Sequence, residues 1–108
     1  MKTYQKLWEL GVACRKLHPK FDVTSWTVLL YVALHEGTSS ANIQIVTGIP
    51  QSTVSRAVAF LSGVGTESRS ALHLIALEPN PEDRRGHKLF LTEEGKAIMK
   101  TLRAIVEA

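Results

Sequence analysis

The chain has 108 residues, 44% of them hydrophobic, so it can form one compact domain with a buried core but is too short for two. No apolar run reaches the roughly 18 residues of a transmembrane helix, and the N-terminus lacks the apolar stretch of a signal peptide. The single cysteine, Cys14, cannot form an internal disulfide, which predicts a reducing, cytoplasmic environment. The net charge of +3 is weak evidence for a polyanionic partner, so the placement of the cations matters more.

Two helices are predicted at the start of the chain. Apolar residues at helical spacing indicate a helix over residues 3–18, which ends there because the residue before Pro19 avoids the helical conformation. A second helix is expected over residues 25–36, with Thr24 or Ser25 as its N-cap. Its stretch VLLYVAL is apolar on nearly every side, which predicts a position in the middle of the domain.

Two short helices follow, around residues 41–47 and 50–61. In the first of them, Ile43 and Val46 are expected to face the core. The second opens with a proline, which is tolerated in the first turn because its missing N–H is not needed there. Two short helices joined by a tight turn, here at Gly48, are typical of a helix-turn-helix.

A hairpin and a closing helix complete the chain. The predicted elements are a Gly- and Ser-rich loop at 62–70, a strand over 72–77, a turn over 79–86, a return strand over 88–91 and a helix over 93–106 capped by Thr92. The expected fold class is therefore α+β and mostly helical. It is a winged helix-turn-helix in a single domain, residues 1–108, with flanking N- and C-terminal helices.

The fourth predicted helix has two different faces. A rotation of 100° per residue places apolar side chains inward: Val54, Ala57, Val58 and Leu61. The opposite face carries small side chains and one cation, namely Ser52, Ser55, Arg56 and Ala59, with Thr53 and Phe60 on its flank. Small side chains let a helix approach the floor of a DNA major groove, where Arg56 either reads guanine or contacts only phosphate. The alternative is an ordinary amphipathic helix with a polar outer face.

Cations gather at the tip of the predicted hairpin: Arg84, Arg85, His87 and Lys88, with Arg69 upstream. Pro79 and Pro81 stiffen the turn, and Asp83 is close enough in sequence to orient Arg85. An oriented arginine on a narrow wing suits the DNA minor groove. The alternatives are a solvated loop or a local ion pair that shapes the turn. An exposed ion pair contributes only about 0–1 kcal/mol, so stability is a poor reason for two arginines here.

Three segments resemble the MarR family of bacterial transcriptional regulators: VTSWTVLLYVAL, TGIPQSTVSRAVAFL and NPEDRRGHKLFLTEEGKAI, together covering roughly residues 23–98. The resemblance implies a dimeric winged-helix protein that binds duplex DNA. It places the family's wing arginine at Arg85, the supporting acid at Asp83 and the recognition-helix contacts at Ser52, Thr53, Ser55 and Arg56. The chain departs from the family in its shorter terminal helices and in a longer link over residues 62–71.

The sequence therefore predicts a sequence-specific DNA-binding regulator, by default a repressor, with helix 51–61 in the major groove and wing 79–88 in the minor groove or on the backbone. The expected DNA contacts are Ser39, Gln51, Ser52, Thr53, Ser55, Arg56, Arg84, Arg85, His87 and Lys88. A homodimer on a pseudo-palindromic site is expected, because one winged helix contacts few bases. Its predicted surface lies on helices 1–18 and 93–108 and comprises Tyr4, Leu7, Trp8, Ile98, Leu102 and Ile105. The alternative is that these apolar stripes pack on the core of a monomer.

Two other functions remain open: a winged-helix module that binds protein, and a replication or recombination accessory that binds duplex DNA. An enzyme is not expected, since no phosphate loop and no Ser/His/Asp set occurs. No cofactor or metal is expected either, because the four histidines lack metal-ligand spacing. A small-molecule effector is left open. Cys14 is interpreted as a buried structural residue, with a redox sensor as the alternative.

Overall fold

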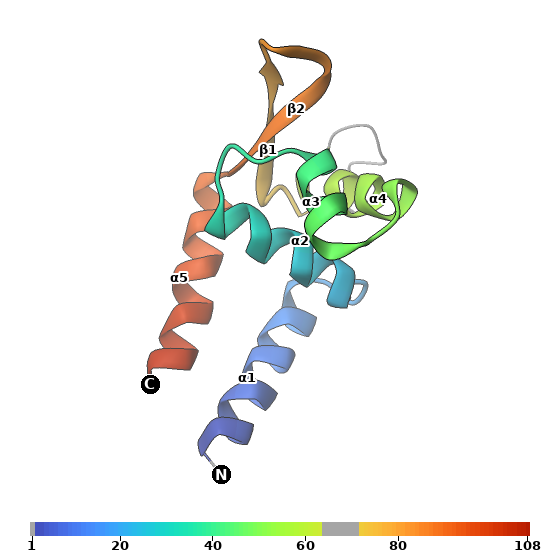
Figure 1. The fold of residues 1–108 in the computed structure, drawn as a ribbon. Helices are drawn as coiled ribbons and strands as arrows, with labels where there is room; N and C mark the ends of the chain where they lie inside the picture. The colour runs from blue at the N-terminus through green and yellow to red at the C-terminus, as the bar shows by residue number, and fades with distance from the viewer. Residues whose placement is uncertain (1, 64–71) are drawn as a thin grey trace.

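The computed structural model describes residues 2–63 and 72–108, and at positions 84 and 85 the backbone alone. Its elements are α1 (Lys2–Leu17), α2 (Val23–Leu34), α3 (Ser40–Thr47), α4 (Gln51–Ser62), β1 (Ile75–Asn80), β2 (Asp83–Leu91) and α5 (Glu93–Glu107) (Figure 1). The predicted fold class, a mostly helical winged helix-turn-helix with flanking helices, is confirmed. Within the described ranges, no helix is long and apolar enough to cross a membrane.

The terminal helices and the hairpin lie at opposite ends of the molecule. α1 and α5 contact each other and run away from the central helices, so that both termini lie at the same end (Figure 1). The hairpin of β1 and β2 projects from the other end. The helix-turn-helix of α3 and α4 lies between them, packed against α2.

The helix ends follow local capping chemistry. α2 begins two residues earlier than predicted because Asp22, rather than Thr24 or Ser25, is the N-cap: its carboxylate accepts a hydrogen bond from the Ser25 N–H at 2.8 Å. Ser39 caps α3 by accepting from the Asn42 N–H at 3.1 Å. Gly48 ends α3 with φ of 74°, a left-handed conformation that glycine adopts without steric cost.

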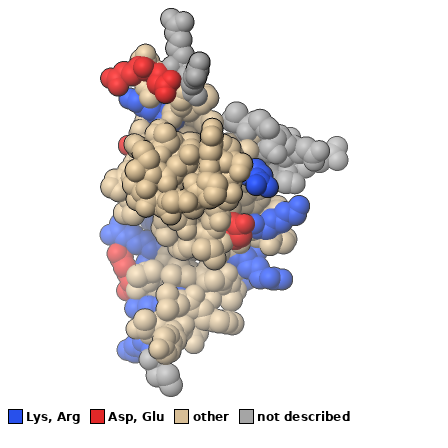
Figure 2. Space-filling view, turned by 45° about the vertical axis from the view of Figure 1, so that its right-hand side comes forward, with Lys and Arg blue, Asp and Glu red and all other residues tan. Residues whose placement is uncertain are grey.

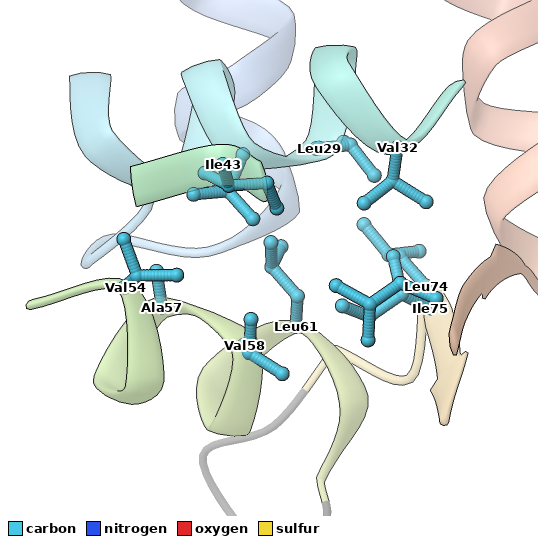
Figure 3. Close-up of a cluster of buried hydrophobic side chains, with 11 residues drawn as sticks. Leu29, Val32, Ile43, Val54, Ala57, Val58, Leu61, Leu74 and Ile75 are labelled. Atoms are coloured by element: carbon cyan, nitrogen blue, oxygen red, sulfur yellow. The ribbon is translucent and has the colours of Figure 1, made fainter. Parts of the chain in front are cut away.

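The core lies where α2, α3, α4 and the hairpin meet. Its side chains point toward a common centre (Figure 3): Val28, Leu29, Val32, Ile43, Val54, Ala57, Val58, Leu61, Leu74, Ile75 and Leu89. The predictions of a central second helix and of four inward residues on α4 are confirmed. The prediction for Val46 was wrong, since it is 61% exposed. The short α3 packs on α4 and β2 through the side that carries Ile43, and Val46 falls outside that contact.

The hairpin is longer and its turn tighter than predicted. β1 pairs antiparallel with β2 from Ile75 opposite Leu91 to Pro79 opposite His87, and an irregularity follows at Asn80. Pro79 is tolerated because a two-stranded sheet leaves one edge of each strand unpaired. The predicted strand at 72–77 starts late, since the N–H groups of Leu72 and Leu74 donate instead to carbonyls of α4, those of Phe60 and Leu61, at 3.0 and 2.7 Å.

The predicted loop at 62–70 begins later in the structure, because α4 includes Ser62. Ser62 is the buried last residue of α4, and Gly63 ends the helix in the left-handed conformation, with φ of 81°. The rest of that loop, including Arg69, lies outside the described residues.

Candidate nucleic-acid interface

The outer face of α4 is polar and carries no acid. Pro50 precedes the helix as its N-cap, and its carbonyl accepts from the N–H groups of Thr53 and Val54 at 3.1 and 3.0 Å. Four residues of the outer face are exposed: Gln51, Ser52, Ser55 and Arg56. The sequence QSTVSRAVAFLS contains no Asp or Glu, so Arg56 is the helix's only charged side chain. A phosphate backbone that approaches this face therefore meets no negative charge on α4 itself.

Arg56 is only loosely held by its own helix. Its Nε donates to the backbone carbonyl of Ser52 at 3.4 Å, a long contact on an exposed surface. The guanidinium group has five N–H donors, so four remain for an external acceptor.

The cap of α3 lies beside α4. The Ser39 hydroxyl is half-buried and already accepts from the Asn42 N–H. A hydroxyl group carries one donor as well as its acceptor lone pairs, so Ser39 can still donate to a phosphate oxygen.

The wing is placed by the tight turn at its tip. The side chain of Asn80 accepts from the Glu82 N–H at 3.0 Å, which closes the turn around Pro81. Asp83 then begins β2, and a Cβ atom added at Gly86 would lie 3.3 Å from its Oδ2 atom. Glycine at this position therefore lets the carboxylate of Asp83 fold back over the strand.

Of the predicted wing contacts, His87 is exposed and Lys88 half-buried. Arg84 and Arg85 follow Asp83 directly in β2, but their side chains, and with them the predicted contact between Asp83 and Arg85, lie outside the described residues. These roles stay predictions.

A groove of about 430 Å³ runs between α3, α4 and the hairpin. It brings together predicted contacts from all three elements: Ser39, Gln51, Ser55 and His87, with Asp83 beside them. It is also lined by three polar residues that the sequence analysis missed, Ser40, Gln44 and Asn80. Ser40 and Gln44 could have been found from the sequence. They are four residues apart on α3, so they lie on the same face of that helix.

The remaining predicted contacts on α4 do not line this groove. Thr53 and Arg56 line a second hollow, of about 350 Å³, together with Lys20, Ser25 and Phe60. The interface predicted from sequence is thus divided by α4 into two flanks, with Ser52 exposed between them.

Comparison with known proteins identifies the architecture. No known family model matches the chain, and no curated protein matches it in sequence. Solved structures do match in three dimensions. A mutant of S. aureus MepR bound to an oligodeoxyribonucleotide gives a TM-score of 0.76 at 17% identity, covering 97% of this chain and 70% of MepR. A MarR transcriptional regulator from Methanosarcina mazei Go1 gives 0.69 at 20% identity, over 97% of this chain and 70% of its own.

The chain has the winged-helix fold of MarR transcriptional regulators. The transcriptional repressor CouR, bound to a 23-mer DNA duplex, shares the fold with a TM-score of 0.67 at 21% identity, covering 98% of this chain and 68% of CouR. The resemblance that the sequence indicated therefore extends to the terminal helices.

Those terminal helices of the MarR fold leave apolar side chains uncovered. On α1, Tyr4 and Trp8 are 75% and 66% exposed, and Leu7 is exposed beside them. On α5, Ile98 and Ile105 are half-buried. Leu102 was predicted to belong to the dimer surface, but it is only 3% exposed in the single chain. It therefore packs internally and contributes no free surface. The reason is that α5 packs against α1 and β2 of its own chain.

Cys14 lies in an apolar hollow of about 430 Å³ between α1 and α2, lined also by Leu10, Phe21 and Trp26. The thiol is half-buried, and this burial raises its pKa above the ordinary value. Near neutral pH it is therefore held in the protonated, unreactive form.

We expect Cys14 to react with a thiol probe more slowly in the folded protein than in the urea-unfolded chain. The reactive species is the thiolate, and each unit of pKa increase lowers its population about tenfold below the pKa. Because the chain has one cysteine, the unfolded protein is its own control. Rates measured from pH 7 to 9 should rise with pH in both states. A folded-state rate equal to or above the unfolded one would instead identify an activated thiol.

Proposed function

We propose that this protein is a transcription regulator that binds duplex DNA with α4 in the major groove and the β1–β2 wing on the adjacent minor groove or backbone. The observation that carries the proposal is the groove between α4 and the wing, because it gathers polar side chains beside an acid-free helix face, with Asp83 of the wing as the acid in its lining. The known structures with this fold include two proteins bound to DNA, which supports the same conclusion.

The dimensions of α4 and of DNA are compatible. An α-helix with its side chains is about 10–12 Å across, and the major groove is about 12 Å wide. The small side chains of Ser52 and Ser55 on the outer face keep α4 near the lower end of that range. A sugar-phosphate strand must then pass between α4 and the wing, where Ser39 and His87 offer hydrogen-bond donors.

We further propose a homodimer formed by the exposed apolar residues of α1 together with the half-buried ones of α5. Exposed aromatic residues on one helix are a common mark of an interaction surface. A two-fold dimer would place two copies of α4 on a pseudo-palindromic site, and a bound dimer would repress by excluding polymerase from its site.

One observation favours a second candidate, a protein-binding module. Ile45 is 80% exposed on α3, next to the exposed Val46. Two adjacent aliphatic side chains on the surface of the helix-turn-helix could contact another protein.

Fluorescence anisotropy on a labelled duplex at several salt concentrations separates these functions. The affinity of the wild type should fall steeply with salt, because bound cations release condensed counterions from DNA. Arg85→Ala should reduce the slope of log K against log salt by about 0.9. Arg103→Ala, which removes an arginine from the outer surface of α5, is the matched control and should keep the wild-type slope.

If the wild type binds no duplex at low salt, DNA binding is rejected and the protein-binding alternative is tested through Ile45. If both arginine variants change the slope equally, the wing has no specific role.

A further inference from the structure

The hollow on the second flank of α4 has the chemistry of an anion site. It lies between α4 and the segment that joins α1 to α2, and it contains two cations from these two elements, Arg56 and Lys20. Hydroxyl groups of Thr53 and Ser25 belong to the same lining. Figure 2 shows Lys and Arg side chains grouped around one acidic residue on one side of the molecular surface.

The two cations are not used in holding the fold together. Among the described residues, neither Lys20 nor Arg56 forms an ion pair. The Asp22 carboxylate also lines the hollow. It is engaged as the N-cap of α2, where it accepts from the Ser25 N–H at 2.8 Å and lies at the positive end of the helix dipole. Two cations against one carboxylate leave the lining with a net positive charge, which an external anion would neutralise.

Lys20 is held next to α4 by its neighbours. Its backbone N–H donates to Nδ1 of His18 at 3.0 Å, and the imidazole ring of His18 packs edge-on against Phe60 of α4, with ring centroids 5.0 Å apart. The linking segment is therefore fastened to the recognition helix, and the Lys20 backbone has a defined position relative to Arg56.

The hollow and the wing groove lie on opposite flanks of α4, and this arrangement indicates which anion the hollow would bind. At 100° per residue, the α4 residues lining the wing groove and those lining the hollow lie roughly 160° apart around the helix axis. A helix that fills a major groove has one phosphate strand along each flank. The wing groove would face one strand, so the hollow would face the other.

We infer that this hollow binds a backbone phosphate of the DNA strand on the side of α4 away from the wing, with Lys20 and Arg56 as the cations and Thr53 as a hydroxyl donor. The inference rests on the proposed function. It assigns Arg56 to phosphate rather than to guanine, and it adds Lys20, which lies outside the helix-turn-helix, to the interface.

The test measures salt-dependent affinity by anisotropy for the wild type, Lys20→Gln, Arg56→Gln and the matched control Lys100→Gln. Lys100 is an exposed lysine of α5, far along the chain from the hollow. We expect Lys20→Gln and Arg56→Gln each to lower the salt slope by about 0.9, on a selected site and on random duplex alike. Lys100→Gln should keep the wild-type slope, and circular dichroism should show that all variants are folded.

A second measurement locates the phosphate. Single phosphates of the selected duplex are replaced by neutral methylphosphonates, one at a time. One replacement should weaken the wild type but have little further effect on Lys20→Gln, because the partner of that phosphate is already absent.

Three outcomes would overturn the inference while leaving DNA binding intact. The first is a Lys20→Gln slope equal to that of the wild type. The second is an equal decrease in the salt slope for Lys20→Gln and Lys100→Gln, which would indicate a non-local effect of charge. The third is an Arg56→Gln loss confined to the selected site, which would make Arg56 a base reader. Failure of the wild type to bind any duplex would reject the proposed function itself, and the inference with it.

Discussion

Replacing Gly95 by alanine is expected to lower the free energy of unfolding by about 2–3 kcal/mol, as overpacking of a well-packed contact does. Gly95 lies in the first turn of α5, and a Cβ atom there would collide with the backbone carbonyl oxygen of Leu74. That oxygen cannot yield easily, because it accepts from the Thr92 N–H at 3.0 Å while the Thr92 hydroxyl caps α5 by accepting from the Gly95 N–H. Urea unfolding at one fixed protein concentration measures the change.

Gly11→Ala is the matched control. Gly11 lies inside α1, and a Cβ atom there would have no neighbour within 4 Å. Alanine should therefore stabilise the chain by up to about 1 kcal/mol through helix propensity alone. If both substitutions changed the free energy of unfolding in the same direction, the close approach of α5 to Leu74 would not be a feature of the folded protein.

Replacing Trp8 by glutamate is expected to raise the dissociation constant of the proposed dimer at least about 100-fold. Trp8 is the largest of the exposed apolar side chains on α1. An unpaired charge buried at an interface costs about 3–5 kcal/mol, and every 1.4 kcal/mol is a factor of ten. Light scattering over a micromolar concentration range measures the change, and affinity for a pseudo-palindromic duplex should fall with it.

Lys2→Gln is the matched control, because it also lowers the net charge by one. Lys2 is exposed on α1, and at 100° per residue it lies roughly 120° around the helix axis from Trp8. It should therefore leave assembly unchanged. A wild type that is monomeric at micromolar concentration would contradict the dimer directly. Trp8→Glu would then have little effect on stability, because an exposed side chain loses little when replaced.

The helical part of this fold could be predicted because its signals are local or periodic. The inward set Val54, Ala57, Val58 and Leu61 repeats at helical spacing, and Gly48 supplies the left-handed end that separates α3 from α4. The cap at Thr92 was found for the same reason, since a hydroxyl before two acidic residues is a local signal.

The features that could not be predicted depend on contacts between distant segments. The sequence predicts a strand at Leu72, yet its N–H donates to a carbonyl of α4. The Leu91 N–H donates to the Glu36 carboxylate at 2.8 Å, although the two residues are 55 positions apart in the sequence. The division of the interface into two flanks was missed for a related reason. In sequence the outer face of α4 is one continuous surface. In the structure the segment around Lys20, packed through His18 and Phe60, lies beside Arg56 on one flank, while the wing lies beside Ser55 on the other.

The two hydrogen bonds from Leu72 and Leu74 to Phe60 and Leu61 have a consequence for how this protein can change during evolution. They return the chain to the last turn of α4 before β1 begins. Because Leu72 and Leu74 are hydrogen-bonded to the end of α4, the number of residues between Gly63 and Leu72 does not set the spacing between α4 and the hairpin. Doubling such a stretch costs only about 0.6 kcal/mol of closure entropy. Insertions there can therefore accumulate while the distance between α4 and the hairpin stays constant.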